Sequence, residues 1–309
     1  MPDITNVAIV GAGLVGQGWA LVFARAGRQV RIHDAGEAET IRSALTATAD
    51  LLAQAGLGPP ADEIMARITI APSLHDAVRS ADYVQESVFE RIDVKRDISR
   101  AIADALPDHA FVGSSTSGFP ASQFTAECPR RDRFLVVHPV NPPHLVPLVE
   151  IVPAPWTDPA VARASRDLMT AVGQSPVSLS REIPGFVLNR LQGALLDEAF
   201  ALLGDGYASA DDIDRAVRDG LGLRWAFMGP FETIDLNAPQ GLADYARRLG
   251  PMYAGFADQR HAERGWSAEA VKAADRQRRE ALPLADLAQR RAWRDAMLTR
   301  IVAGKAGRE

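Results

Sequence analysis

Three closely spaced glycines near the amino terminus constrain the fold of this chain more than any other feature. The apolar residues 7–10 are predicted to form a short buried strand, and Gly11, Gly13 and Gly16 follow this strand directly. A helix is predicted to begin within this turn, and residues 29–33 are predicted to form a second strand. A strand, a glycine-rich turn, a helix and a second strand form one βαβ unit, which indicates a parallel sheet with helices on its faces.

The same glycines predict a site for a dinucleotide. In such a turn the first glycine permits the tight bend, the second lets the backbone approach a pyrophosphate, and the third allows the helix to pack closely on the strand. The start of the helix, including Leu14 and Val15, faces the phosphates. Asp34 ends the second predicted strand, where a carboxylate meets the ribose 2′-hydroxyl and repels a 2′-phosphate. We therefore expect NAD rather than NADP as the cofactor, and a flavin, which shares this fingerprint, is left as an alternative.

The remaining pattern predicts two domains in the 309 residues. Five further short strands are predicted at residues 68–70, 83–85, 110–112, 134–137 and 148–152. Beyond residue 185 the pattern is almost purely helical, and apolar residues between 186 and 202 recur at the spacing of a buried helix face. The expected class is α/β, with a Rossmann-type domain and a mainly parallel sheet in residues 1–185 and an all-helical domain in residues 186–309.

Composition narrows the classes of partner. The formal net charge of −5 argues against a nucleic-acid partner, because such binding needs a basic face. Cys128 is the single cysteine, so the chain cannot form an internal disulfide, which fits a reducing cytoplasm, and we expect Cys128 to be a packing thiol rather than a nucleophile. The apolar amino-terminal run lacks the preceding positive charges of a secretory signal and is rich in glycine, so we expect a soluble protein without a membrane partner or a metal site. Trp293, Met297 and Ile301 share one helix face and are expected to contact the core or a second copy in a homodimer.

His138 is the strongest candidate for proton transfer. It ends the predicted strand 134–137 and precedes a proline-rich loop, and the carboxyl ends of strands are where open α/β sheets bind their ligands. An imidazole can accept and return a proton near neutral pH, as the oxidation of a secondary alcohol requires. Glu150 lies in the next predicted strand and could fix the tautomer of the imidazole. The sequence leaves open whether the two side chains meet.

Six segments together resemble a known family over nearly the whole chain. They are VAIVGAGLVGQGWA, HPVNPPHLVPLVEIVP, GQSPV, PGFVLNRLQ, GLGLRWAFMGPFETIDLN and LAQRRAWRDAML. The chain resembles the L-3-hydroxyacyl-CoA dehydrogenase superfamily, and within it the lambda-crystallin and L-gulonate 3-dehydrogenase branch. The resemblance implies an NAD-dependent oxidoreductase that acts on a CH–OH group.

The resemblance also implies roles for individual side chains. His138 matches the catalytic histidine of the family and Glu150 its paired acid. Ser117, which lies 21 residues before His138, matches the serine that binds the substrate hydroxyl, and Asn189 matches the asparagine that completes the site. Both would donate hydrogen bonds to the reacting oxygen and steady its developing charge.

Two further positions concern the cofactor. Glu90 and Lys95 match family positions that contact the nicotinamide part of NAD. Ser115 stands where many members of the family have asparagine, a departure beside the site.

The charge pattern after Asp34 bears on the substrate. Family members that use acyl-CoA resemble one another in having a lysine-rich helix pair in this region, which suits the CoA phosphates. Between residues 35 and 70 this chain has two basic side chains, Arg42 and Arg67, against five acids, Glu37, Glu39, Asp50, Asp62 and Glu63. A negative surface is a poor site for a polyanion, so we expect a small substrate without CoA.

A second departure is the segment GLRWAFMGP, in which Arg224 could bind a substrate carboxylate through two hydrogen bonds. An arginine at a domain or subunit interface is an equal alternative. We expect oxidation of the 3-hydroxyl of a small, L-gulonate-like L-3-hydroxy acid, or the reverse reduction. The alternatives are an L-3-hydroxyacyl-CoA dehydrogenase, acting for example on 3-hydroxybutyryl-CoA, and a crystallin-like structural or NADH-binding protein.

Overall fold

The computed structural model describes residues 4–256 and 266–306. The chain divides into two compact units. The first lies within Met1–Leu188 and Ala292–Glu309, and the second is Asn189–Arg291. Helix α14 (Leu287–Ala306) therefore begins in the second unit, and its later turns belong to the first, where Leu298 packs against the main core. The predicted domain boundary after residue 185 stays a prediction, because compactness alone does not define a domain.

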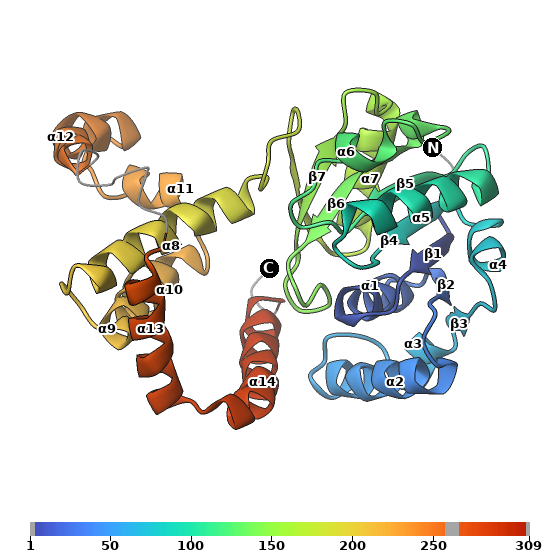
Figure 1. The fold of residues 1–309 in the computed structure, drawn as a ribbon, viewed down its shortest axis with the longest axis horizontal. Helices are drawn as coiled ribbons and strands as arrows, with labels where there is room; N and C mark the ends of the chain where they lie inside the picture. The colour runs from blue at the N-terminus through green and yellow to red at the C-terminus, as the bar shows by residue number, and fades with distance from the viewer. Residues whose placement is uncertain (1–3, 257–265, 307–309) are drawn as a thin grey trace. The chain divides into compact units, whose positions relative to one another are not determined.

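The first unit is built on an eight-stranded sheet (Figure 1). Its strands are β1 (Asn6–Val10), β2 (Gln29–His33), β3 (Ile68–Ile70), β4 (Tyr83–Glu86), β5 (Phe111–Ser114), β6 (Phe134–Pro139), β7 (Leu148–Pro153) and β8 (Ser175–Ser178). They lie in the order β3-β2-β1-β4-β5-β6-β7-β8, and every neighbouring pair is parallel except β6 and β7. The predicted Rossmann-type domain with a mainly parallel sheet is confirmed.

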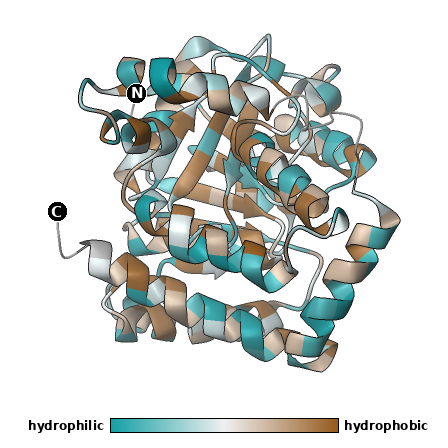
Figure 2. Ribbon diagram, turned by 90° about the vertical axis from the view of Figure 1, so that its left-hand side faces the viewer, coloured by the Kyte–Doolittle hydropathy of each residue, from teal (hydrophilic) through white to brown (hydrophobic). Residues whose placement is uncertain are grey.

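Helices cover both faces of this sheet. They are α1 (Leu14–Arg25), α2 (Ala38–Gln54), α3 (Ala61–Met65), α4 (Leu74–Val78), α5 (Ile92–Ala105), α6 (Ser122–Thr125) and α7 (Pro159–Ala171), with a 3-10 turn at Arg131–Arg133. Along β1, Val7 and Ile9 join the core formed with α1, α2 and α7, whereas Ala8 and Val10 join the core formed with α4 and α5. Because both faces are buried, β1 and β6 are mostly apolar, and much of the sheet in the middle of Figure 2 is brown.

The described residues of the second unit are helical, as predicted. The elements are α8 (Leu188–Gly204, with its first residue in the first unit), α9 (Ala210–Arg215), a π-helical stretch (Ala216–Leu221), α10 (Gly222–Trp225), α11 (Pro230–Asp235), α12 (Leu242–Gly255), α13 (Ala268–Ala281), a 3-10 turn (Leu284–Asp286) and the start of α14. Ser209 caps α9, because its side chain accepts a hydrogen bond from the backbone N–H of Asp212. A serine followed by an acid three residues later is a pattern typical of such a helix start.

One expectation about α8 was wrong. The apolar stripe between residues 186 and 202 was predicted to be buried, yet no residue of α8 is buried within the chain. Leu191 is 62% exposed and Leu195 is 36% exposed. Phe186 is buried, but it precedes the helix and has a positive φ of 51°. The spacing of apolar residues identifies a helix face and does not say what covers that face.

Strand β8 was not predicted. It contains two serines and one proline in four residues, and none of the four is buried. Its pairing with β7 arises from backbone hydrogen bonds, for which the side-chain pattern carries no signal.

The tight packing of β5 between its neighbours gives a test of this sheet. A Cβ atom at Gly113 would lie 2.2 Å from the hydroxyl oxygen of Tyr83 and 2.6 Å from a methyl carbon of Val137. We expect Gly113→Ala to lower the free energy of unfolding by about 1–3 kcal/mol, because the side chains of Tyr83 and Val137 must shift. Urea denaturation measures this change.

Gly58→Ala is the matched control, because the nearest atom to its new methyl group, Cδ1 of Ile64, lies at an ordinary 3.6 Å. Equal urea midpoints for Gly113→Ala and Gly58→Ala would contradict the packing described for β5.

Candidate active site

The glycine-rich turn between β1 and α1 has the geometry that a dinucleotide requires. Gly11 has a φ of +98°, and a Cβ there would lie 2.5 Å from the carbonyl oxygen of Ser87. A Cβ at Gly16 would lie 1.9 Å from the carbonyl oxygen of Gly11. At Gly13 a Cβ would meet nothing within 4 Å, and no side chain caps the helix that starts after it. The first and third glycines are therefore required by the protein's own packing, and the second leaves its side of the turn open to a phosphate.

Asp34 lies at the carboxyl end of β2, against this turn. Its carboxylate accepts hydrogen bonds of 2.6 Å from the backbone N–H groups of Ala12 and Gly36, one on each oxygen. The carboxylate is partly exposed, so it keeps lone pairs for a ribose hydroxyl. Together with the start of α1, at Leu14 and Val15, these groups fit NAD.

The predicted pair of His138 and Glu150 meets. The antiparallel register of β6 and β7 sets the two residues directly opposite each other, and the distance from His138 Nδ1 to Glu150 Oε2 is 2.8 Å. Both side chains are buried. The other oxygen of Glu150 accepts hydrogen bonds from the backbone N–H groups of Val187, at 2.7 Å, and Leu188, at 3.0 Å. The ring of Phe186 packs against the imidazole with ring centroids 5.4 Å apart.

These contacts keep Glu150 ionised. Burial raises the pKa of its carboxyl group, but the hydrogen bonds from His138, Leu188 and Val187 outweigh burial and hold the pKa below its ordinary value. An ionised Glu150 only accepts hydrogen bonds, so Nδ1 of His138 donates to it, and in the neutral imidazole Nε2 is then the nitrogen with a lone pair. The tautomer needed by a general base is therefore the one that the surroundings of His138 favour.

Ser117 lies in the loop after β5, where its backbone is held by Glu90. The Oε1 atom of Glu90 accepts hydrogen bonds from the N–H groups of Ser117, at 2.8 Å, and Gly118, at 3.2 Å. It also accepts a hydrogen bond of 2.6 Å from the hydroxyl of Thr116. Burial raises the pKa of Glu90, but these hydrogen bonds and the charge of Lys95 outweigh it and lower that pKa. The side chain of Ser117 is exposed, as a substrate-binding hydroxyl must be.

Lys95 lies inside the protein, with its side chain 1% exposed. Its ammonium is 3.1 Å from an oxygen of Glu86 and 3.3 Å from Oε2 of Glu90. Sequence reasoning missed Glu86, the last residue of β4. A charged residue directly after the predicted strand 83–85 was its only signal.

Ser115, the departure noted in the sequence, is part of a polar network. Its hydroxyl oxygen accepts hydrogen bonds from Nε1 of Trp19, at 3.2 Å, and from Nε2 of Gln85, at 2.7 Å, and lies 2.8 Å from the hydroxyl oxygen of Ser87. Trp19 is wholly buried, so its indole N–H needs such a partner. The small side chain of serine gives the indole this acceptor.

Two predicted site residues belong to the second unit. Asn189 lies in the first turn of α8, directly after Leu188, and Arg224 lies on the exposed surface of α10. The structure thus brings together His138 with Glu150, and Ser117 with Glu90 and Lys95. The places of Asn189 and Arg224 in the site stay predictions.

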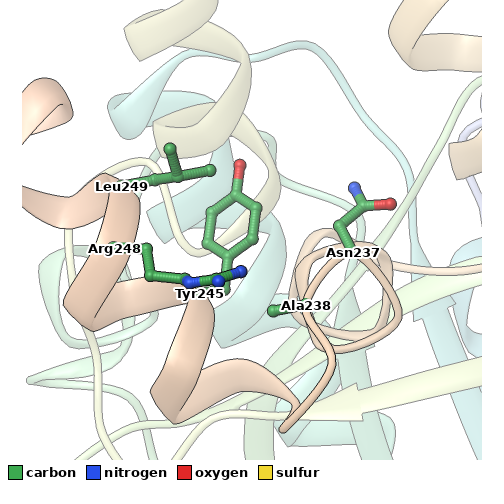
Figure 3. Close-up of a pocket in the computed structure, with 5 residues that line it drawn as sticks. All are labelled: Asn237, Ala238, Tyr245, Arg248 and Leu249. Carbon is green, nitrogen blue, oxygen red and sulfur yellow. The ribbon is translucent and has the colours of Figure 1, made fainter.

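The second unit also contains a small pocket that the sequence did not predict. It has a volume of about 280 Å³ and is lined by Asn237, Ala238, Tyr245, Arg248 and Leu249. Figure 3 shows Tyr245 and Arg248, both on α12, on one side and Asn237 and Ala238, which follow α11, on the other. Arg248 lies 3.7 Å from the carboxylate of Asp244, so its charge is already partly balanced.

Two further sequence predictions can be compared with the described residues. Cys128 is buried, and burial raises the pKa of its thiol to about 11, which suits a packing role and not a nucleophile. Among residues 4–256 and 266–306, the structure has no helix that is both long and apolar enough to cross a membrane.

The surroundings of Glu150 predict a pH-dependent contribution to stability. Because its pKa is lower in the folded state, the carboxylate stabilises the fold fully above its unfolded value of about 4.3, and this contribution is lost as the pH falls through the folded pKa. We expect Glu150→Gln to lower the free energy of unfolding by about 1–2 kcal/mol at pH 7, because the hydrogen bonds lose their charged acceptor. Urea denaturation should show a smaller difference from wild type below pH 4.

Glu127→Gln is the control, because the side chain of Glu127 is 81% exposed. It should change the stability little at either pH. A difference between wild type and Glu150→Gln that stays constant from pH 7 to pH 3.5 would show that the carboxylate has no lowered pKa.

Comparison with known proteins identifies the family. The family model described as the NAD binding domain of 3-hydroxyacyl-CoA dehydrogenase matches residues 6–183, and the model of its C-terminal domain matches residues 185–284. The chain is 39% identical to the lambda-crystallin homolog of Bos taurus, over 96% of this chain and 94% of that protein. It is 38% identical to the L-carnitine dehydrogenase of Streptomyces griseus, over 81% of this chain and 75% of that protein.

The solved structures agree. An NAD-dependent 5-formyl-3-hydroxy-2-methylpyridine 4-carboxylic acid 5-dehydrogenase superposes with a TM-score of 0.82 at 29% identity, covering 96% of this chain and 97% of that one. The resemblance to the lambda-crystallin branch and the expectation of NAD as cofactor are confirmed. The chain belongs to the 3-hydroxyacyl-CoA dehydrogenase family and is an NAD-dependent oxidoreductase that acts on a CH–OH group.

Proposed function

We propose that the protein oxidises the 3-hydroxyl group of a small L-3-hydroxy acid to the 3-oxo acid, or catalyses the reverse reduction, and that an L-gulonate-like acid is the leading substrate. The observation that carries this proposal is the buried hydrogen bond of 2.8 Å between His138 and Glu150, at the carboxyl end of a strand in the NAD-binding unit. This pair supplies a base with a fixed tautomer where open α/β sheets bind ligands.

Each residue has a defined task in this proposal. Nε2 of His138 accepts the proton of the substrate hydroxyl, and Glu150 stabilises the imidazolium that forms. Ser117 and Asn189 donate hydrogen bonds to the reacting oxygen. Bound NAD, held by the glycine-rich turn and Asp34, supplies the hydride acceptor.

The surface of α2 and α3 supports a free acid over a CoA thioester. The acids of this region are exposed, as is Arg42, whereas the guanidinium of Arg67 already donates to the carbonyl oxygen of Glu63. The surface therefore offers little positive charge to the phosphates of CoA. One relative is named an L-carnitine dehydrogenase, and carnitine is itself a small 3-hydroxy acid.

Arg224 is our candidate for the anchor of the substrate carboxylate. It is exposed on a helix of four residues, and a guanidinium binds a carboxylate through two parallel hydrogen bonds. An interface role for the same arginine is the alternative, and an assay separates the two. Loss of the carboxylate anchor raises the KM for the acid, whereas loss of an interface changes the oligomeric state.

Reduction of NAD at 340 nm tests the proposed function. We expect turnover of at least one free acid among L-gulonate, L-carnitine and 3-hydroxybutyrate, and weaker turnover of 3-hydroxybutyryl-CoA. We expect His138→Ala to lower kcat by roughly 10²–10⁴-fold, because the general base is lost. Arg224→Gln should raise the KM for a free acid and leave that for a neutral alcohol unchanged.

Three outcomes would decide against this proposal. Activity confined to the CoA thioester would favour a 3-hydroxyacyl-CoA dehydrogenase. Binding of NADH without turnover of any acid would favour a crystallin-like structural or NADH-binding protein. Full activity of His138→Ala would show that His138 is not the general base.

We also propose that the protein is a homodimer. The exposed apolar stripe on α8, with Leu191 and Leu195, supports this proposal, as do Trp293 and Ile301, each 49% exposed. A stripe of this kind on a helix of a water-soluble protein usually contacts another surface.

Sedimentation equilibrium measures the oligomeric state. We expect a mass of twice the 33.3 kDa chain, and a shift toward the monomer in the double variant Leu191→Glu, Leu195→Glu. Leu51→Glu on α2 is the matched control, because Leu51 is 64% exposed and should leave the mass unchanged. A monomeric wild-type protein at micromolar concentration would contradict the proposal.

A further inference from the structure

Three charged side chains meet at the carboxyl end of β4, apart from the His138–Glu150 pair. The ammonium of Lys95 lies 3.1 and 3.2 Å from the two carboxylate oxygens of Glu86 and 3.3 Å from Oε2 of Glu90. The side chains of Lys95 and Glu86 are both 1% exposed. A buried charge is costly unless it is paired, so the three groups depend on one another.

This charged cluster of Glu86, Lys95 and Glu90 is connected to the loop that carries Ser117. Oε2 of Glu90 is held by Lys95, and Oε1 accepts hydrogen bonds from the N–H groups of Ser117 and Gly118 and from the hydroxyl of Thr116. Both oxygens of this carboxylate are therefore fixed. Movement of Glu90 would release three hydrogen bonds of the loop together.

Glu86 fixes the same region from the side of the sheet. One oxygen accepts a hydrogen bond from the hydroxyl of Ser114, the last residue of β5, and the other accepts one of 2.8 Å from the N–H group of Val88. Ser114 lies three residues before Ser117. The carboxylate of Glu86, which binds Lys95, therefore also fixes the end of β5 and the loop after β4.

We propose that Glu86 and Lys95 are positioning residues of the reaction, which hold Glu90 so that its carboxylate fixes the backbone of Ser117. The inference rests on the proposed function, because that proposal gives Ser117 its role. It assigns to Lys95 a task inside the protein, in addition to the nicotinamide contact that the family resemblance implies. Glu86 acquires a role that the sequence did not indicate.

Amide hydrogen exchange tests these contacts without any measurement of activity. We expect Lys95→Met to speed exchange of the amides of Ser117 and Gly118 by roughly 10-fold, the loss expected for one hydrogen bond to a charged acceptor. Arg91→Met is the matched control, because Arg91 lies next to Glu90 in the chain but is exposed and pairs with Asp93. It should leave the exchange of both amides unchanged.

Kinetics and cofactor binding separate positioning from cofactor contact. Lys95→Met should lower kcat/KM for the acid on the order of 10–100-fold, since a misplaced hydrogen-bond donor costs that much. The Kd of NADH, measured by fluorescence, reports the cofactor contact of Lys95 separately from the exchange of the loop. A raised Kd for NADH with unchanged exchange would make Lys95 a cofactor contact only and overturn the proposal.

Two further variants keep the test decisive. If the unpaired charge of Glu86 prevents Lys95→Met from folding, the double variant Glu86→Gln, Lys95→Met removes both charges and should show the same fast exchange. In a Ser117→Ala background, Lys95→Met should cost little further activity, because it acts through that serine. Full additivity of the two effects would refute the positioning role.

The proposed function and this inference fail in different ways. If Ser117→Ala turns over substrate at the wild-type rate, Ser117 has no role in the reaction. The charged cluster would then have no effect on kcat/KM through Ser117. Unchanged amide exchange of Ser117 and Gly118 in Lys95→Met and in the double variant would show that the charged cluster does not fix the loop, even if Ser117 proves essential.

Discussion

The antiparallel pairing of β6 with β7 is the interaction on which the site depends. Its register sets His138 opposite Glu150, and a slip by one residue would turn one of the two side chains to the other face of the sheet. Glu150 also accepts hydrogen bonds from the backbone N–H groups of Val187 and Leu188. One carboxylate therefore orients the imidazole and fixes the chain where α8 begins.

Glu150 and Glu90 are used in the same way. Each binds a positively charged or polar side chain through one oxygen and two backbone N–H groups through the other. The backbone donors and the partner side chains are in place before substrate arrives, so little reorganisation is needed during the reaction. These two carboxylates place a predicted base, His138, and a predicted hydroxyl donor, Ser117.

Local patterns were enough to predict the dinucleotide turn, Asp34 and the position of His138 at a strand end, because each depends on residues close together in sequence. The contact of His138 with Glu150 was not predictable from spacing, since it depends on the register across a 12-residue separation. Glu86 was missed because a buried lysine partner, Lys95, lies on a helix whose packing the sequence does not show. Burial of the α8 stripe was predicted wrongly, because periodicity does not reveal which surface covers a helix face.

The chemistry of the site does not itself select the substrate. In the proposed reaction a histidine–glutamate pair and a hydroxyl donor act on the CH–OH group, and their contacts do not depend on what the acid carries beyond it. We therefore propose that charges outside this pair discriminate between a free acid and a CoA thioester, since α2 and α3 present mostly acids. The relatives of this chain include proteins named for crystallin, carnitine and acyl-CoA, which fits a substrate class set by such surface charges. The glycine-rich turn depends on backbone geometry that tolerates little change, whereas under the proposed function the substrate is selected by side chains that can vary without altering the fold.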